Sequence, residues 1–272
     1  MKKLIFLLIA LASSLATADV YQWQDGNGKA HFSDRPTIDA QAKKLDIKPG
    51  YDFIRVKTVY DGDTVVLEDG QKVRFLGINT PEVQHRDKPA DAGGDEAKRW
   101  LQAKLLNKRV RLELANEKTD KYGRTLAHLF TENKEHINLQ LVTAGLAAVN
   151  IYPENLLYVS ELVEAEERAE KAHLGIWQQP QYQPQSVNSL SESKPIGWTR
   201  VVGRVVAIKT TNKSIYLEFS DHFQARIEKQ WLTLFPDVND YNGKTIEVRG
   251  WINKSNDRLS MLIRHPSAIK FR

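Results

Sequence analysis

Residues 53–78, FIRVKTVYDGDTVVLEDGQKVRFLGI, contain runs of apolar and β-branched residues at 53–60, 64–67 and 73–78. Short runs of this kind, separated by polar residues, are typical of β-strands. The segment Glu68–Gln71 is a tight polar turn with a glycine, which predicts that a hairpin joins the last two runs. The stretch therefore predicts three consecutive strands.

Further strands alternate with helices on the C-terminal side of this stretch. Residues 110–114 form a fourth strand-like run, and 124–130 and 135–137 flank a polar turn at 132–134. Five short strands with helices inserted between them predict a small closed barrel against which helices pack.

Three helices are predicted from apolar residues that recur at helical spacing. The first begins near Asp95, a candidate N-cap, and runs to about Leu106; the second has Asn138 as its candidate N-cap. The third runs from about residue 154 to 173, with Leu157, Leu162 and Val163 directed inward. Its charged run 161–171 is interpreted as a solvated face with charge pairs four residues apart.

Composition narrows the class of protein. The chain has 272 residues, of which 41% are hydrophobic and 27% are charged, and its formal net charge is +5. These values exclude collagen-like, fully disordered and polytopic membrane proteins. The chain contains no cysteine, which excludes disulfides, thiolate nucleophiles and zinc–thiolate sites.

The N-terminus has the pattern of a secretory signal peptide. Two lysines precede the apolar run 4–11, and Ala16-Thr17-Ala18 is a small-residue cleavage site, so residues 1–18 are predicted to be removed. The apolar run is too short to span a bilayer, which needs about 20 residues. We therefore expect an exported monomer, periplasmic or secreted, without stable membrane insertion.

Residues 19–50 form a small β module, with an Asp-Gly-Asn-Gly turn at 25–28 between two strand-like runs. The module resembles a short domain of unknown function found at the N-termini of bacterial envelope proteins. His31 is interpreted as a residue on a hairpin face. In the barrel, His128 is interpreted as a packing residue and His136 as an exposed one.

Residues 178–196 are rich in Gln, Pro and Ser and predict a linker. Residues 197–272 contain five strand-like runs and predict a second small OB-like β-barrel. Most of its large aromatic residues are assigned to the core: Tyr216, Phe219, Phe223, Trp231 and Trp251. Together with residues 51–177 these segments predict a mainly β protein with helices (α+β).

The candidate chemistry lies within residues 51–177. Asp61-Gly62-Asp63-Thr64 brings two carboxylates into one turn, and hard oxygen ligands of this kind suit Ca²⁺ or Mg²⁺. Arg74 begins a strand, Glu82 follows the end of that strand, and Arg124 begins another. Two arginines, carboxylates and an unpaired glutamate are what phosphodiester hydrolysis requires, because arginine neutralises phosphoryl oxygens and glutamate takes a proton from water.

These motifs, together with Asp120–Arg124 and the closing Leu174–Trp177, resemble the thermonuclease (staphylococcal nuclease-like) family from Val56 to Trp177. The resemblance implies an OB-fold barrel with three helices and a Ca²⁺-dependent nuclease of low sequence specificity, acting on DNA and RNA with metal-held water. Its implied roles are metal ligation by Asp61, Asp63, Asn79 and Thr80; catalysis by Arg74, Glu82 and Arg124; and substrate binding by Lys121, Tyr122 and Tyr152.

Two positions depart from the family pattern. Asn79 stands where the family has a second calcium-ligand aspartate, so one negative charge is missing and weaker Ca²⁺ binding or another divalent metal is expected. Asn150 stands where an aromatic residue is expected. An alternative interpretation is a catalytically weak or inactive envelope protein that binds nucleic acid or protein.

The charge is unevenly distributed. Residues 52–177 carry a net charge of −3, whereas residues 197–272 carry +6. This difference suggests that the C-terminal domain contributes to the electrostatic attraction of nucleic acid while the first barrel cleaves it.

Overall fold

The computed structural model describes residues 20–25, 29–33, 42–45, 53–84, 89–190, 197–255 and 258–272. The chain divides between Asp52 and Phe53 into two compact units, which are considered separately. The predicted signal peptide, residues 1–18, lies outside the described residues. Within the described residues, no helix combines the length and apolar character needed to cross a membrane.

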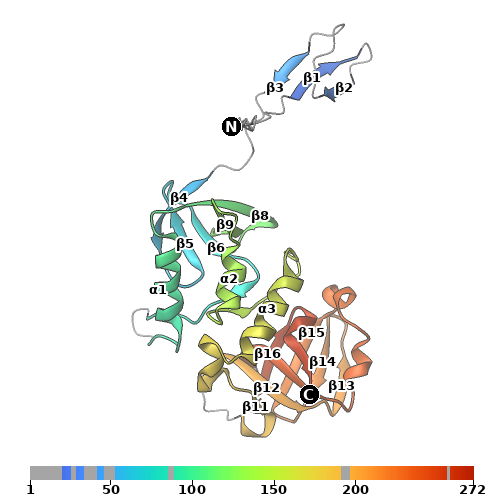
Figure 1. Ribbon diagram of the computed structural model, residues 1–272. Coiled ribbons are helices and arrows are strands. Elements are labelled where there is room, and N and C mark those ends of the chain that lie inside the picture. The colour runs from blue at the N-terminus through green and yellow to red at the C-terminus, as the bar shows by residue number, and fades with distance from the viewer. Residues whose placement is uncertain are drawn as a thin grey trace, which may run out of the picture. The chain divides into compact units, whose positions relative to one another are not determined.

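The first unit contains a three-stranded antiparallel sheet in the order β2-β1-β3. Its strands are β1 (Val20–Gln24), β2 (Ala30–Ser33) and β3 (Lys43–Leu45), drawn in blue in Figure 1. Trp23 stacks on His31, with ring centroids 5.5 Å apart, and His31 Nε2 lies 2.9 Å from Asp25 Oδ2. His31 thus lies on the hairpin, as expected.

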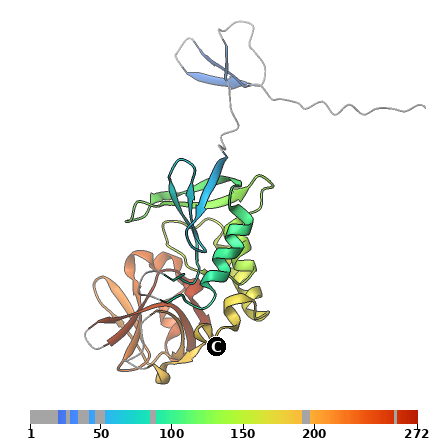
Figure 2. The same cartoon turned by 90° about the vertical axis from the view of Figure 1, so that its left-hand side faces the viewer.

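The second unit begins with a closed barrel in the strand order β4-β5-β6-β9-β8, which confirms the predicted fold class. β6 and β9 run parallel, and the other neighbours run antiparallel. The barrel is visible at the top of this unit in Figure 2. Its strands are β4 (Ile54–Val59), β5 (Thr64–Leu67), β6 (Lys72–Phe75), β8 (Arg109–Thr119) and β9 (Thr125–Thr131).

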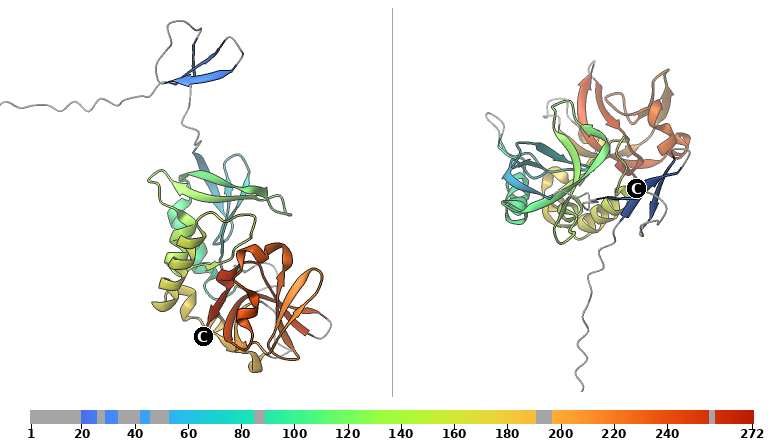
Figure 3. Two further views of the ribbon diagram at one scale, coloured as in Figure 1. Left: turned by 90° about the vertical axis from the view of Figure 1, so that its right-hand side faces the viewer. Right: turned by 90° about the horizontal axis from the view of Figure 1, so that it is seen from above.

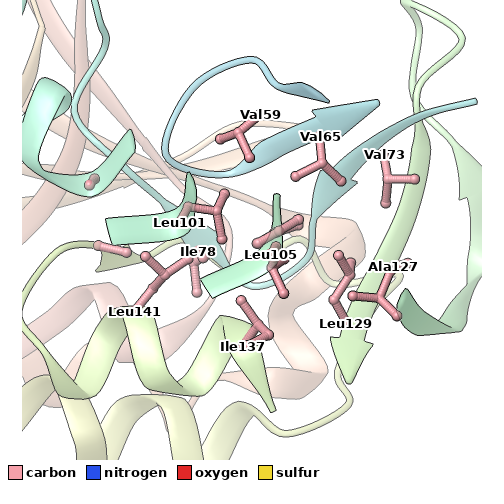
Figure 4. Packing of buried hydrophobic residues seen from close by; sticks show 14 of the residues in the cluster. Val59, Val65, Val73, Ile78, Leu101, Leu105, Ala127, Leu129, Ile137 and Leu141 are labelled. Carbon is pink, nitrogen blue, oxygen red and sulfur yellow. The ribbon is translucent and has the colours of Figure 1, made fainter. Parts of the chain in front are cut away.

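Three helices cover this barrel: α1 (Gly94–Leu105), α2 (Ile137–Thr143) and α3 (Val159–Lys171). Figure 4 shows side chains of α1 and α2 meeting those of the strands. Leu101 and Leu105 pack with Val65 and Leu129 in a cluster of fully buried residues. Burial of this apolar surface holds the helices on the barrel.

The expected N-caps of the first two helices are wrong. Gly93 precedes α1 with a φ of 96°, which places it in the left-handed region, and Asp95 lies inside the first turn. His136 precedes α2. The side chain of Asn138 is buried instead, where it accepts a hydrogen bond from Leu129 N at 3.0 Å and donates one to Leu76 O at 2.9 Å. Asn138 thus satisfies barrel backbone groups.

The third helix begins at Val159, five residues later than predicted. Tyr158 precedes it with a φ of 60°, a conformation that cannot continue a right-handed helix backwards along the chain. As a consequence Leu157, which was expected to face inward, is exposed, whereas Leu162 is buried as expected.

The C-terminal sheet runs in the order β11-β12-β16-β17-β15-β14-β13, and β18 pairs with β16. Apart from the two-residue strand β11, the sheet begins with β12 and ends with β13, which only residues 205 and 206 separate along the chain; β15 and β17 are parallel, like β6 and β9. Figure 3 shows this second barrel-like sheet in orange and red. The strands are β11 (Gln185–Ser186), β12 (Trp198–Arg204), β13 (Ala207–Thr210), β14 (Ser214–Glu218), β15 (Phe223–Glu228), β16 (Thr245–Ser255), β17 (Arg258–Ile263) and β18 (Ile269–Phe271).

Phe219 and Phe223 belong to the core of this sheet, whereas Tyr216, Trp231 and Trp251 are half-buried. Short 3₁₀ turns connect the strands: η4 (Lys229–Leu234), η5 (Val238–Tyr241) and η6 (Pro266–Ala268).

The described part of the predicted linker packs against the rest of the unit. It contains η2 (Pro180–Tyr182), β11 and η3 (Val187–Ser189), and it follows η1 (Gly175–Gln178), which ends at the first residue of the linker. The Tyr182 ring is buried between Trp177 and Trp198, with centroids 6.1 Å and 5.2 Å away. This cluster joins the end of the first barrel to β12.

Helix α3 is bound to the C-terminal sheet by buried ion pairs, so the prediction that residues 161–171 form a solvated face is wrong for Glu166 and Glu170, although Glu164 and Arg168 form an exposed pair four residues apart, as expected. Arg249 of β16 contacts Glu166 at 2.9 Å, Glu170 at 2.6 Å and Glu247 at 2.6 Å. Arg200 of β12 contacts Glu247 at 2.8 Å and also Glu170. The side chains of Arg249 and Glu166 are only 4% and 3% exposed. We call these five residues the interdomain ion cluster.

Burial raises the pKa of Glu166 in spite of the charge of Arg249. Burial also acts to raise the pKa of Glu247, but hydrogen bonds from Arg200 and the charge of Arg249 bring it down to about 2. Because opposite charges lie next to one another, the cluster compensates part of the large cost of removing ions from water.

His128, which is buried, and His136, which is half-buried, form a pair in which His128 Nδ1 lies 3.0 Å from His136 Nε2. His128 packs in the barrel as expected, but His136 is half-buried rather than exposed because the rings of Phe130 and Tyr158 lie 4.6 Å and 4.7 Å from it. Burial lowers the pKa of His128 to about 3 and that of His136 to about 4.

The contribution of these two histidines to stability is therefore expected to fall as the pH decreases from 6.5 toward 4. A histidine in the unfolded chain binds a proton near pH 6.5, whereas His136 in the folded chain stays neutral until about pH 4, so protons favour the unfolded state in this window. At about pH 4.5 the loss due to His136 is about 2 kcal/mol. The thermal unfolding midpoint should decrease less between pH 7.5 and 4.5 in His136→Gln than in the wild type. Equal decreases would contradict the assignment.

Candidate functional site

The Asp-Gly-Asp-Thr turn connects β4 to β5 and places Asp63 inside the barrel end. Asp63 N donates to Asp61 Oδ1 at 3.0 Å, which closes the turn and brings the two carboxylates together. A Cβ at Gly62 would lie 2.7 Å from Thr80 Oγ1 and 2.7 Å from Ala97 Cβ. Only glycine fits, because the turn packs directly against the segment that follows β7 (Ile78–Asn79) and against α1.

Asp63 and Arg74 form a buried ion pair at the centre of the site. Arg74 Nη2 lies 2.9 Å from Asp63 Oδ2, and the same carboxylate oxygen accepts a hydrogen bond from Thr80 N at 2.9 Å. Arg74 Nη1 also donates to the carbonyl oxygens of Phe75 at 2.7 Å and Ile78 at 3.0 Å. The guanidinium is therefore fixed by backbone and carboxylate together.

Asn79 connects Arg74 to Thr80. Its Oδ1 accepts a hydrogen bond from Arg74 Nη2 at 3.1 Å, and its Nδ2 donates to Thr80 O at 2.9 Å. Asn79 lies on β7, which pairs with β10 (Ala148–Val149). The structure thus brings together four of the predicted residues: Asp63, Arg74, Asn79 and Thr80.

Two carboxyl groups of the site hold protons more strongly than usual. Burial, followed by the charge of Asp63, raises the pKa of Asp61 to about 7. Partial loss of hydration and the charge of Asp63 also raise the pKa of Glu82, against the lowering effect of Arg74 and Arg124. The charges of both arginines thus act on the Glu82 carboxyl group.

The loop that carries Glu82 is tied to the start of α1. Asp91 N donates to Glu82 O at 2.9 Å, and Glu82 N donates to Asp91 Oδ2 at 3.3 Å. A Cβ at Gly94 would lie 2.3 Å from Glu82 O, so the absence of a side chain at this position lets the loop approach the helix. Residues 85–88 lie outside the described residues.

Arg124 is held by Asp120 across the charged turn before β9. Arg124 Nε and Nη2 each lie 2.7 Å from Asp120 Oδ2. Burial acts to raise the pKa of Asp120, but hydrogen bonds from Arg124 N and its side chain lower it overall. Among the residues that the structure describes, Asp120 contacts Nε and Nη2 of Arg124 but no partner is found for Nη1, which can therefore bind an anion.

Lys121 and Tyr122 stand at the surface of the same turn. Lys121 Nζ lies 5.0 Å and the Arg124 guanidinium carbon 5.6 Å from the centroid of the Tyr122 ring, which is exposed. An exposed aromatic ring beside two cations is suited to contact a base or a phosphate.

Tyr152 follows the strand that pairs with β7. Val149 lies opposite Ile78, and Asn150 N donates to Gly77 O at 2.9 Å. The Tyr152 ring is exposed, whereas Asn150 is half-buried.

Sequence reasoning did not find Asp91, Gly94 or Tyr182 as parts of this region. The Gly93–Gly94 pair before a helix is a usable signal of close backbone approach. Tyr182 lies close enough to Glu82 and Asp91 for their charges to raise its pKa further, after burial, and the pattern of the linker contained no sign of this.

The donor set fits a divalent cation in its chemistry. The pKa of Asp61 is raised because it lies buried beside Asp63, and a cation between these carboxylates would remove that repulsion. The fit is incomplete at two positions, since Asn79 Oδ1 already accepts from Arg74 and Thr80 O from Asn79. The groups that best fit a cation are therefore Asp61 and Asp63, with one lone pair left on Thr80 O.

Together, these groups can bind and act on a phosphodiester. Arg74 and Arg124 supply positive charge for phosphoryl oxygens, and Glu82 supplies a carboxylate with a raised pKa, on which the charges of both arginines act. Acidic and basic groups held at one barrel end are what phosphoryl-transfer chemistry needs.

Comparison with known proteins agrees with this geometry. A family model described as "Staphylococcal nuclease homologue" matches residues 72–179, and one described as "Domain of unknown function (DUF4124)" matches residues 7–52. The "Thermonuclease" of Staphylococcus intermedius is 35% identical over 181 residues, which cover 65% of this chain and 99% of that protein. The "Thermonuclease" of Staphylococcus hyicus is 36% identical over 126 residues, covering 45% and 74%.

"Endonuclease YncB" of Bacillus subtilis is 26% identical over 202 residues, covering 67% of this chain and 95% of that protein. The thermonuclease of Staphylococcus intermedius is 35% identical to this chain over nearly its whole length, and the region that the family model matches contains Arg74, Glu82 and Arg124. The chain therefore belongs to the staphylococcal nuclease homologue family.

Proposed function

We propose that the protein is an exported, metal-dependent nuclease that hydrolyses phosphodiester bonds of DNA and RNA with low sequence specificity. The observation that carries this proposal is the Asp63–Arg74 ion pair, which Thr80 N and Asn79 fix in place. The charges of Asp63, Arg74 and Arg124 all act on the pKa of Glu82. Membership of a family whose relatives are named thermonuclease and endonuclease supports the proposal.

Each side chain has a role that follows from its surroundings. Glu82 accepts the proton of the attacking water, and its raised pKa makes it a stronger base than an ordinary surface glutamate. Arg124 presents Nη1 to a phosphoryl oxygen while Asp120 fixes its other nitrogens. Arg74 stabilises the charge that develops on phosphorus-bound oxygens in the transition state.

A divalent cation, with Ca²⁺ as the first candidate, would be held by Asp61 and Asp63 together with Thr80 O, and Asn79 would be a neutral fourth donor. When bound, it would polarise a phosphoryl oxygen and bind the attacking water.

Asn79→Asp is expected to strengthen Ca²⁺ binding by about tenfold. A carboxylate at this position adds a charged ligand and ends the amide hydrogen bond to Thr80 O, which then becomes available. Isothermal titration of wild type and variant with Ca²⁺ and with Mg²⁺ measures the change. An unchanged Ca²⁺ affinity would show that Asn79 does not limit binding.

Gly94→Ala is expected to reduce kcat by at least about tenfold without unfolding the protein. The new Cβ would displace the Glu82 loop by clashing with Glu82 O, and small misplacements of catalytic groups cost up to about 100-fold. Gly197→Ala is the matched control, because Gly197, like Gly94, has no positive φ, but nothing lies within 4 Å of the new Cβ. Equal rates for the two variants would contradict the role of the loop.

The test of the proposed function is cleavage of plasmid DNA and of RNA by the mature protein, with Ca²⁺ or with chelator. Glu82→Gln and Arg124→Ala should each be slower by about 100-fold or more. Glu68→Gln makes the same chemical change as Glu82→Gln on an exposed turn and should retain full rate. Absence of chelator-sensitive cleavage, or equal rates for all variants, would favour a binding protein without catalysis.

Export rests on the sequence pattern of residues 1–18. Fractionation of cells that express the full-length chain tests it: the protein should lack residues 1–18 and occur in the periplasm or the medium. Retention of the intact N-terminus in the cytoplasm would reject export.

A further inference from the structure

The C-terminal sheet contributes an arginine to the edge of the candidate site. The guanidinium carbon of Arg264, the residue after β17, lies 4.8 Å from the centroid of the Tyr152 ring. Tyr152 lies three residues beyond Val149, which is opposite Ile78, and the carbonyl of Ile78 accepts a hydrogen bond from Arg74. Arg264 thus contacts Tyr152, and the segment before Tyr152 pairs with β7, whose Ile78 carbonyl binds the catalytic arginine Arg74.

Arg264 retains its capacity to bind an anion. Within the part of the chain that the structure describes, its guanidinium has no carboxylate partner and makes no hydrogen bond, although it is half-buried. Nearby arginines of the same sheet differ, since Arg249, Arg258 and Arg272 are all paired with glutamates. A partly buried, uncompensated arginine is costly unless a ligand supplies the opposite charge.

Tyr152 keeps part of its ring available. It is 46% exposed even though Arg264 lies over it. An aromatic ring that carries an arginine on one side and retains open surface is the combination that single-stranded nucleic acid binds, by stacking of a base and pairing of its phosphate.

The position of Arg264 is fixed by the interdomain ion cluster. Arg249 and Arg200 hold the C-terminal sheet on α3 through Glu166, Glu170 and Glu247, and Arg249 is buried within this contact. A binding residue on a rigidly docked element keeps its geometry relative to the site.

From these contacts we infer that Arg264 and Tyr152 form a strand-binding subsite, which contacts a single-stranded nucleic acid beyond the nucleotide that is cleaved. This inference rests on the proposed function for the identity of the ligand. Part of the attraction of nucleic acid that the net charge of +6 in residues 197–272 predicts would then come from one defined contact, that of Arg264.

The experiment measures binding and cleavage separately. Binding of a fluorescent 12-nucleotide single-stranded DNA is followed by anisotropy in the presence of chelator, and the KM for the same strand is compared with that for a dinucleotide in Ca²⁺. Arg264→Ala should weaken binding of the 12-nucleotide strand about fivefold or more and raise its KM similarly. Its kcat and its KM for the dinucleotide should stay within about twofold, since the subsite lies outside the reacting centre.

Four variants test the alternatives. Lys213→Ala removes one exposed positive charge from the turn between β13 and β14 and should change binding less than twofold. Arg264→Lys keeps the charge but loses the planar group and should lie between wild type and Arg264→Ala. Tyr152→Ala should weaken binding of the long strand. The double variant with Arg264→Ala should lose less binding free energy than the sum of the two single losses, because the two residues act on one nucleotide.

The outcomes separate the subsite from the proposed activity. Equal losses for Arg264→Ala and Lys213→Ala, or an equal KM increase for the dinucleotide, would overturn the subsite. A wild type that binds the strand but does not cleave it would reject the nuclease function and leave the subsite measurable by anisotropy. A wild type that does not bind the strand would reject both. Unfolding midpoints of all variants should agree with the wild type within a few degrees.

Discussion

Replacement of Arg74 by lysine is expected to reduce kcat for phosphodiester cleavage by roughly 100-fold to 1,000-fold. Lysine keeps the positive charge, but one ammonium group cannot contact Asp63, Asn79 and the carbonyl oxygens of Phe75 and Ile78 at the same time. The bidentate geometry of the guanidinium, rather than its charge alone, is therefore what the site uses.

Steady-state kinetics on a single-stranded oligonucleotide measures this effect, and KM should change far less than kcat. Arg55→Lys is the matched control, because Arg55 is an exposed arginine on β4 that also donates to a backbone carbonyl, that of Asn107. If Arg74→Lys retained more than about a tenth of the wild-type kcat, charge alone would suffice and the role assigned to the fork would be wrong.

Replacement of Arg249 by methionine is expected to lower the free energy of unfolding by about 3 to 5 kcal/mol. Methionine fills a similar volume but leaves Glu166 and Glu170 with fewer partners, and Glu166 is buried with a pKa that is already raised. Denaturant unfolding measures the difference. Because the cluster joins α3 to the C-terminal sheet, both parts should be destabilised together.

Arg168→Met serves as the control on the same helix. Its partner is Glu164 at 3.6 Å, and the two side chains are 68% and 69% exposed, so water screens the pair and its loss should cost less than about 1 kcal/mol. In the Arg249→Met background, Glu166→Gln should restore part of the lost stability by removing the unpaired charge. Similar midpoints for Arg249→Met and Arg168→Met would show that the cluster is energetically neutral.

The cluster also determines how the C-terminal sheet can be studied. Deletion of residues 197–272 would expose Glu166 and Glu170 without partners, so a change in KM would report misfolding as well as lost contacts. Point variants such as Arg264→Ala avoid this difficulty.

The barrel was predictable because local signals and the global fold agree. Residues 53–78 contain three strands bounded by strong turns. Val56, Val65 and Val73, one on each strand, lie in the core, and the local pattern of apolar residues is enough to predict this. The boundaries of the helices were less predictable. Gly93 and Tyr158 adopt left-handed conformations just before α1 and α3, and neither helix has a side-chain cap that would mark its first residue in the sequence.

The members of the candidate site were predictable as residue types, but their connections were not. Asp63, Arg74 and Glu82 stand out at strand ends, yet the hydrogen bonds of Asn79 to Arg74 and Thr80 depend on where β7 ends. Gly94 and Asp91 act through backbone contacts with Glu82, which a sequence pattern does not encode.

The run 161–171 shows why a helix face cannot be assigned from its own charges. Glu164 and Arg168 form the exposed pair that the spacing predicts, whereas Glu166 and Glu170 are covered by β16 and β12. All four lie in one continuous charged stretch. The difference between them comes entirely from Arg200 and Arg249, which lie in another part of the chain.

That separation along the chain has a consequence for biosynthesis. Glu166 meets Arg249 across 83 positions of sequence, and at about 5 to 20 residues per second a ribosome needs roughly 4 to 16 seconds to add them. During this interval the completed α3 carries carboxylates without their arginines. The first barrel is therefore synthesised in full before the arginines that pair with α3 exist. An interruption of translation before residue 249 would release a protein that contains every catalytic side chain but not the finished fold.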